Sequence, residues 1–133
     1  MIIDTMVVAY ALLKQRDYGL ESAEALRKAD ELTAPASVEA ELLNVFWQWG
    51  QLYIPPSEAT AFYVDAAEIW DKLIPVKALW PSALSLAFER SHSPYDTLFV
   101  AAARMRGTKV LTYDKNLLKR FPEDTMTVAD FLR

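Results

Sequence analysis

Residues 93–114 read SPYDTLFVAAARMRGTKVLTYD and carry the clearest local signals in the chain. Ser93 is a favoured helix N-cap, Pro94 suits the first helical position, and Gly107 stands where a helix C-terminal glycine belongs. The segment that follows, Lys109–Thr112, is typical of a buried strand. We therefore predict a helix between Ser93 and Gly107 that leads directly into a strand.

The same alternation of short strands and longer helices extends through the rest of the chain. Strands are expected at residues 1–4, 31–34, 74–79, 109–112 and 126–128. The other helices are expected at residues 5–15, 21–29, 38–49, 57–73, 81–90 and 115–120. Ser37 is a good N-cap for the helix from residue 38, and Gly50 is expected to end it. Because parallel strands need crossover connections, the predicted fold class is α/β: a three-layer α/β/α sandwich around a central, mostly parallel sheet of four or five strands.

Length and composition limit the classes of protein that need to be considered. A chain of 133 residues has room for one domain, expected to span residues 1–133. The absence of cysteine excludes disulfide scaffolds, thiolate metal sites and cysteine nucleophiles, and one histidine is too few for a His-rich zinc site. The longest apolar run, Met6–Leu13, is far shorter than the roughly 20 residues of a membrane span. We expect a cytoplasmic protein without membrane contact.

Charge is distributed unevenly along the chain. The formal net charge is −4, yet residues 86–133 hold 8 Lys and Arg against 6 Asp and Glu. Most of this positive charge comes from Arg104, Arg106, Lys109, Lys115, Lys119 and Arg120. These side chains could contact phosphates, or they could form an ordinary solvated helix face.

Three aspartates follow predicted strands or begin predicted helices. Asp4 follows the first strand directly, Asp114 follows the strand Lys109–Thr112 after one tyrosine, and Asp96 lies in the first turn of a helix. Each could simply stabilise a helix N-terminus. However, ligands of open parallel sheets bind beyond the carboxyl ends of the strands. Carboxylates gathered there would repel one another unless a cation lay between them.

Helical periodicity selects a fourth acidic residue. In the helix from Val38, Glu41 shares a narrow polar strip with Asn44 and Gln48, beside the apolar stripe. Glu39 falls on another part of the helix, and in the first turn the helix dipole explains it. The pattern therefore favours Glu41 over Glu39 as a residue that faces a wet cleft.

Two other kinds of residue near the acids have competing interpretations. His92 precedes the Ser93 helix and has no visible partner, so an exposed loop residue is favoured over a catalytic base. Tyr95 and Tyr113 flank two of the acids, where they could stack on unpaired bases or pack inside the protein.

Four short motifs, taken in order, resemble the successive motifs of PIN domains, and most of all those of the VapC-type toxins. These are Asp4-Thr5, the segment PASVEAELLN at residues 35–44, SPYDT at residues 93–97 leading into Ala101–Ala103, and VLTYDK at residues 110–115. Each motif is weak alone, whereas the ordered set is fairly specific and covers nearly the whole chain. The resemblance implies a metal-dependent ribonuclease on a Rossmann-like parallel sheet.

The resemblance also implies roles for individual residues. Asp4, Glu41, Asp96 and Asp114 match the family's four acids, which would act in catalysis and bind Mg²⁺ or Mn²⁺. Thr5 and Thr112 match hydroxyl residues that accompany the first and last acids. Asn116 stands where some members carry a further acid, so a full second metal site is in doubt. The expected reaction is attack by water on an RNA phosphodiester, which leaves a 3′ hydroxyl and a 5′ phosphate.

The middle of the chain is unusually aromatic and predicts protein partners. Eight aromatic residues lie within 35 positions: Phe46, Trp47, Trp49, Tyr53, Phe62, Tyr63, Trp70 and Trp80. Apolar residues wrap around more than one face of the helix from Val38, which is more than a single core contact requires. A homodimer and a groove for a small cognate antitoxin would both use such a surface, and the resemblance implies both.

Two alternative functions remain open at this point. A catalytically inactive, PIN-like interaction module would keep the acids as helix caps and act through its aromatic surface. A receiver domain has the same type of sheet, but the chain lacks paired acids after the first strand and a lysine after the last.

Overall fold

The computed structural model describes all residues, Met1–Arg133, and its centre is a sheet of five parallel strands. The strands lie in the order β3-β2-β1-β4-β5. Their bounds are β1 Ile2–Ile3, β2 Thr33–Pro35, β3 Lys72–Ile74, β4 Val110–Leu111 and β5 Thr125–Met126. β2 and β4 lie on either side of β1, so the direction in which successive strands are added to the sheet reverses at β1. The carboxyl ends of β1 and β4 are therefore neighbours at the place where such sheets bind ligands.

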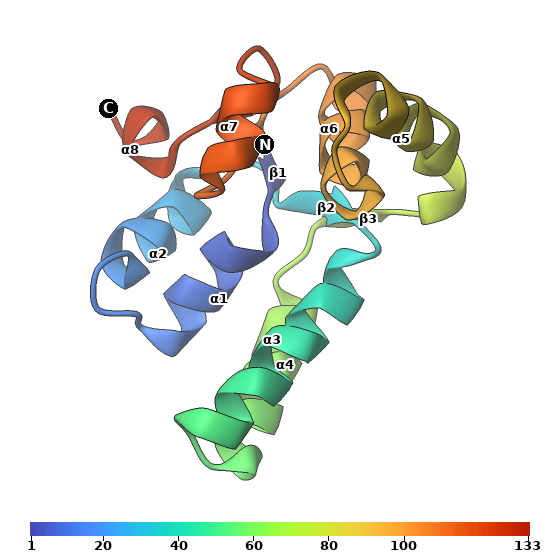
Figure 1. The fold of residues 1–133 in the computed structure, drawn as a ribbon. Coiled ribbons are helices and arrows are strands. Elements are labelled where there is room, and N and C mark those ends of the chain that lie inside the picture. Colours follow the sequence, from blue (N-terminus) through green and yellow to red (C-terminus); the bar gives the residue numbers. More distant parts are fainter.

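Eight helices connect and cover the strands. Their bounds are α1 Thr5–Leu13, α2 Gly19–Lys28, α3 Val38–Leu52, α4 Pro56–Glu68, α5 Val76–Arg90, α6 Pro94–Arg106, α7 Lys115–Arg120 and α8 Val128–Phe131. In Figure 1, α5 and α6 lie on one side of the strands, and α1 and α2 lie on the other. The predicted three-layer α/β/α sandwich with a parallel sheet is confirmed. None of these helices combines the length and apolar character that a membrane crossing demands.

Helix α6 forms as its end signals predict. The Ser93 hydroxyl accepts a hydrogen bond from the backbone N–H of Tyr95, and Gly107 ends the helix with a φ of 64°. All residues from Thr97 to Ala103 are buried, because α6 lies between β1, β2 and β4 on one side and α5 on the other. The Thr97 hydroxyl donates to the Ala83 carbonyl of α5 at 2.7 Å, which satisfies the only polar side chain in that run. This packing holds the first turn of α6 in a defined place.

Helix α3 is longer than predicted. Gly50 does not end the helix, which continues to Leu52. A Cβ atom at Gly50 would lie 3.1 Å from Cβ of Ala59, so glycine is suited here to the close approach of α3 and α4 rather than to a turn. Ser37 does occupy the N-cap position, but its buried hydroxyl makes no hydrogen bond. Together α3 and α4 form a hairpin that projects away from the sheet (Figure 1).

The prediction for residues 57–90 was wrong in its boundaries. The predicted strand 74–79 is instead β3 at Lys72–Ile74, followed by α5, which begins at Val76. The predicted helix 57–73 ends at Glu68, since residues 72–74 pair with β2. Pro81 lies inside α5 rather than at its start. Pro81 is exposed, so water can bond the backbone carbonyl that its missing N–H leaves free.

Candidate active-site cleft

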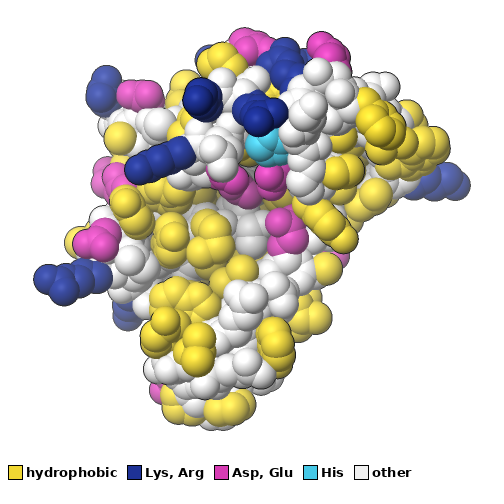
Figure 2. All heavy atoms as spheres, viewed as in Figure 1, with side chains coloured by type: hydrophobic (Ala, Val, Ile, Leu, Met, Phe, Trp, Pro, Cys, Tyr) yellow, Lys and Arg dark blue, Asp and Glu magenta, His cyan; other side chains and the backbone are white.

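All four predicted acids line one cleft of about 400 Å³ at the carboxyl ends of the strands. Asp4 connects β1 to α1, and Asp114 connects β4 to α7. Glu41 comes from the first turn of α3 and Asp96 from the first turn of α6. Figure 2 shows acidic side chains gathered in the middle of the face that is viewed, beneath a group of Lys and Arg side chains. Residues up to 110 positions apart in the sequence thus meet because parallel strands end at a common edge.

Asp4 lies at the centre of this arrangement. Its Oδ1 accepts from the backbone N–H of Thr5 at 2.8 Å, and its Oδ2 accepts from Oγ1 of Thr112 at 2.5 Å. The Thr112 hydroxyl also accepts from the backbone N–H of Asp114 at 3.0 Å, which links the ends of β1 and β4. Burial raises the pKa of Asp4 to about 6, in spite of these hydrogen bonds, and the charges of Asp96 and Asp114 add to the rise.

Glu41 carries a carboxylate oxygen that has no partner. Its Oε2 is buried and accepts no hydrogen bond, and the neighbouring Thr5 hydroxyl is likewise buried without a partner. Burial raises the pKa of Glu41 to about 7, with further contributions from the charges of Asp4 and Asp96. Glu39, by contrast, is exposed and does not line the cleft. The choice of Glu41 over Glu39 therefore agrees with the placement of the two side chains.

His92 contacts Asp96, which was missed in the sequence interpretation. The imidazole Nε2 lies 2.8 Å from Oδ2 of Asp96, and only 9% of the His92 side chain is exposed. The ring meets Phe121 edge-on, with 5.8 Å between the ring centroids. The four-residue spacing of His92 and Asp96 was the available signal, but the proline between them suggested that the two residues lie in different elements. The expectation that His92 is an exposed loop residue without a partner was wrong.

Asp114 serves both as a helix cap and as a wall of the cleft. Its Oδ1 accepts from the backbone N–H groups of Asn116 and Leu117 at 2.8 and 3.1 Å, which caps α7. Its other oxygen remains free of protein donors. The Asn116 side chain is exposed and does not line the cleft. Asp4 likewise caps α1, so the capping and cleft interpretations hold together for both residues.

The oxygen atoms of the cleft fit a hard divalent cation. No three acidic side chains lie close enough together to form a ready coordination shell. One oxygen of each aspartate accepts a hydrogen bond from a protein group, and the other oxygen of Asp96 and of Asp114 accepts none. The unpartnered Oε2 of Glu41 nevertheless lies among carboxylates that raise one another's proton affinity. Mg²⁺ and Mn²⁺ prefer such oxygen ligands and need neither Cys nor His. The assignment of particular residues as ligands stays a prediction.

The predicted basic residues are only partly free. Arg104 makes two hydrogen bonds with Asp124, at 3.0 and 2.9 Å, and Arg106 pairs with Glu31 at 2.8 Å. Arg120 donates to backbone carbonyls at the end of α5. The remaining three make no ion pair or side-chain hydrogen bond: Lys109, Lys115 and Lys119. Only these lysines are available for phosphates without the loss of an internal contact.

Comparison with known proteins gives a consistent family assignment. The PIN domain family model matches residues 1–123. Ribonuclease VapC3 of Pyrobaculum aerophilum is 24% identical over 127 residues, which cover 92% of this chain and 95% of that protein. A crystal structure of a Pyrobaculum aerophilum protein superimposes with a TM-score of 0.76 at 16% identity, over 98% of this chain and 90% of the other. A toxin–antitoxin complex from Klebsiella pneumoniae gives a TM-score of 0.64 at 15% identity, over 96% of each chain.

The two solved structures have the same fold as this chain. The family match includes β1, α3, α6 and β4, the elements that bring the four acids to the cleft. The resemblance noted from the four sequence motifs is thereby confirmed, and the chain belongs to the PIN domain family.

Proposed function

We propose that this protein is a metal-dependent endoribonuclease, the toxin of a toxin–antitoxin pair. The observation that carries the proposal is that the carboxylates of Asp4, Glu41, Asp96 and Asp114 line one cleft, where the buried Oε2 of Glu41 accepts no hydrogen bond. The family, and the name of the Pyrobaculum aerophilum ribonuclease to which the chain is similar, support the same reaction. An RNA substrate and the absence of cysteine also suit a cytoplasmic protein.

In this proposal the four acids share the work of binding and proton transfer. Asp4 and Asp96 are the principal ligands of Mg²⁺ or Mn²⁺, while Glu41 and Asp114 bind it directly or through water. When bound, such a cation would supply Lewis-acid chemistry: it would lower the pKa of a nearby water molecule and would offset the negative charge that develops on the phosphodiester. The Oε2 of Glu41, which accepts no hydrogen bond from the protein, is the atom placed to accept a proton from the attacking water. Thr112 holds Asp4 and His92 holds Asp96 during this chemistry.

Two surfaces support the proposed protein partners. A groove of about 480 Å³ between α3 and α4 is lined largely by apolar side chains, among them Leu43, Trp47 and Tyr63. We assign it to the cognate antitoxin, because an amphipathic segment could bury its apolar face there. A separate stripe on α5 exposes Val76, Trp80, Leu84 and Phe88 at intervals of four residues. We assign this stripe to a homodimer contact, since a helix face of this kind needs a partner.

The inactive interaction module is the alternative, and one observation favours it. Asp4 and Asp114 both cap helices, so both could be retained without any cleavage. The test is RNA cleavage by the purified wild-type protein with Mg²⁺ or Mn²⁺, compared with Asp4→Asn and Asp96→Asn. The proposal expects cleavage by the wild type and its loss in both variants, with their folds intact by circular dichroism. Equal cleavage by wild type and the double variant would discard the site, and growth arrest by wild type but not by Asp96→Asn would support the toxin role.

A further inference from the structure

A further cavity, of about 460 Å³, adjoins the acidic cleft. It lies where α1, α2, α7 and α8 approach one another. The residues that matter for its chemistry are Tyr10, Tyr18, Glu21, Tyr113 and Lys115. Tyr10 and Tyr113 line the acidic cleft as well, so the two cavities share these two rings as a common wall.

Three tyrosine rings form a compact cluster at that wall. The ring centroids of Tyr10 and Tyr18 lie 5.5 Å apart in a stacked arrangement, and those of Tyr18 and Tyr113 lie 4.8 Å apart. Tyr113 meets Tyr10 edge-on at 5.4 Å. Tyr18 is 42% exposed, so this residue is partly open to solvent. Part of the aromatic surface of the cluster is therefore accessible to a ligand.

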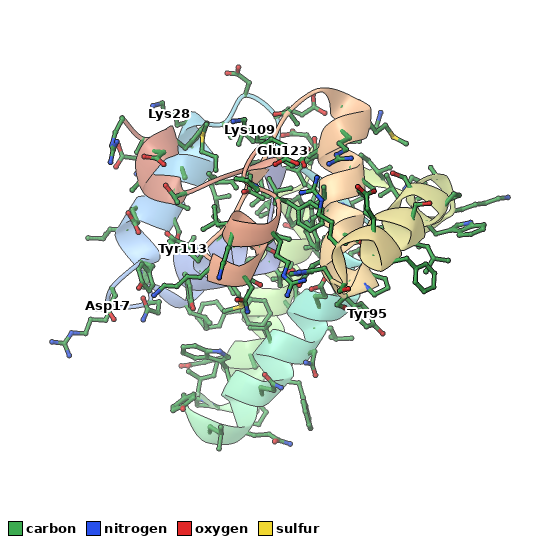
Figure 3. The ribbon with its side chains drawn as sticks, turned by 45° about the horizontal axis from the view of Figure 1, so that its top comes forward. Asp17, Lys28, Tyr95, Lys109, Tyr113 and Glu123 are labelled. Atoms are coloured by element: carbon green, nitrogen blue, oxygen red, sulfur yellow. The ribbon has the colours of Figure 1, made fainter.

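Contacts between its hydroxyl group and α2 hold Tyr113 in place. Its hydroxyl lies 2.7 Å from the hydroxyl of Ser22, which is fully buried in α2, and donates to Oε1 of Glu21 at 3.1 Å. Figure 3 shows Tyr113 where α7 meets α1 and α2, with Tyr95 on the opposite side beside α3. Tyr95 lines neither cavity. A ring fixed in this way can act as a stacking surface with little loss of side-chain entropy on binding.

Charged groups complete the chemistry of the cavity. The Lys115 side chain is exposed, directly follows Asp114 in the sequence, and makes no ion pair or hydrogen bond with the protein. Glu21 offers a carboxylate, which can only accept hydrogen bonds and so favours bases with exocyclic amino groups. Aromatic faces beside a free cation are the usual means of holding an unpaired base and its phosphate.

We propose that this cavity, which we name the tyrosine subsite (Tyr10, Tyr18, Glu21, Tyr113 and Lys115), binds one unpaired nucleobase of the RNA next to the cleaved phosphodiester. Tyr18 and Tyr113 supply stacking surface, and Lys115 contacts the phosphate on that side. The choice of RNA as ligand rests on the proposed function. No residue of the tyrosine subsite is a proposed ligand of the cation, so base binding can be measured separately from cleavage.

The test measures binding of short single-stranded RNA to protein that carries Asp96→Asn, which prevents cleavage during the measurement. A series of oligonucleotides, each with one abasic position, locates any base that the protein holds. Further substitution of Tyr18→Ala should weaken binding of the intact oligonucleotide about 5- to 150-fold, the usual effect of removing one stacking side chain. Tyr18→Phe should bind normally. Tyr53→Ala, an exposed tyrosine outside both cavities, is the matched control.

The abasic series separates stacking from an indirect effect on the fold. One abasic position should weaken binding to the Asp96→Asn protein yet cause no further loss when Tyr18→Ala is also present, because the two changes remove the same contact. Lys115→Gln lies on the exposed first turn of α7 and cannot disturb the core, so it tests the tyrosine subsite even if Tyr18→Ala unfolds. It should weaken binding and reduce the dependence of affinity on salt.

The tyrosine subsite is wrong if Tyr18→Ala and Lys115→Gln bind every oligonucleotide as Tyr53→Ala does. The proposal is also wrong if the losses of binding free energy caused by Tyr18→Ala and by each abasic position are additive. An effect of these variants on antitoxin binding alone would assign the surface to a protein instead. Position-specific base binding by a wild-type protein that cleaves no RNA would support the tyrosine subsite while it refutes the proposed nuclease.

Discussion

His92 and Asp96 form a direct contact, with 2.8 Å between the imidazole Nε2 and the carboxylate Oδ2. Because an ionised carboxylate only accepts hydrogen bonds, Nε2 carries the proton and donates it. The mostly buried ring rests against Phe121, so His92 has little freedom to turn. The histidine therefore sets the direction in which Asp96 presents its other oxygen to the cleft.

Removal of this hydrogen bond should weaken metal-dependent activity without loss of the fold. We expect His92→Leu to raise the Mn²⁺ concentration needed for half-maximal RNA cleavage about 10- to 100-fold, which is typical for loss of a group that orients a metal ligand. His92→Gln can place an amide N–H near the same position and should recover much of the loss. Cleavage measured across a Mn²⁺ titration checks this. Equal metal requirements for the two variants would show that His92 only packs.

Glu41 and its neighbour Glu39 provide a matched pair of substitutions. Glu41→Gln removes the unpartnered carboxylate of the cleft and should slow RNA cleavage about 10²- to 10⁴-fold, the usual contribution of a proton-transfer group. Glu39→Gln changes an exposed residue in the same turn and should leave the rate unchanged. Single-turnover cleavage rates test both. If the two substitutions have the same effect on the rate, Glu41 has no special part in the reaction.

The two roles of Asp114 can be separated by the choice of substitution. Asp114→Asn keeps a side-chain oxygen that can cap α7, so stability should change little while cleavage falls. Asp114→Ala removes the cap as well and should lower the free energy of unfolding by about 0.5 to 2 kcal/mol. Urea unfolding of both variants, together with their cleavage rates, distinguishes the roles. Full activity in Asp114→Asn would leave Asp114 as a cap alone.

The stability of the metal-free protein should fall as the pH rises from about 4 to 7. The pKa values of Asp4 and Glu41 are raised from 3.8 to about 6 and from 4.5 to about 7, so the folded state holds these protons more tightly than the unfolded state. Their contribution to the free energy of unfolding is fully present below the pKa values of the unfolded state. It is lost as the pH rises through the raised pKa values of the folded state. The loss is about 3 kcal/mol for the buried Asp4, and it is smaller for Glu41 than its pKa alone implies, because solvent screens that partly exposed group. Glu41→Gln should flatten the profile of unfolding free energy against pH.

Divalent cations should reverse that loss at neutral pH. A cation that binds only the folded state stabilises it by about 2.7 kcal/mol at 100 times its dissociation constant. We therefore expect Mg²⁺ or Mn²⁺ to raise the melting temperature of the wild type at pH 7.5, and EDTA to restore the lower value. The double variant Asp4→Asn, Asp96→Asn should show no rise. An equal rise in this variant would place the cation elsewhere on the protein.

The fold was largely predictable because its signals are local. The α6 helix begins at Ser93-Pro94 and stops at Gly107 through caps that act within a few residues. The alternation of strands and helices predicted a parallel sheet, which is confirmed. Errors arose where distant contacts overrode local preference. Gly50 is helical because α4 packs closely against it, and β3 starts at Lys72 because it pairs with β2.

The functional site can be considered in the same way: the sequence predicts some of its features, and only the tertiary structure determines the others. Strand ends, helical periodicity and the resemblance to PIN-domain motifs singled out Asp4, Glu41, Asp96 and Asp114, which line one cleft, while their catalytic roles stay a prediction. Only the tertiary structure decided that His92 supports Asp96 and that three tyrosines from separate segments form one wall beside the cleft. Burial and charge proximity, which raise the pKa values of Asp4 and Glu41, likewise exist only once the chain has folded. Such properties depend on which groups meet in space, and no local pattern records that.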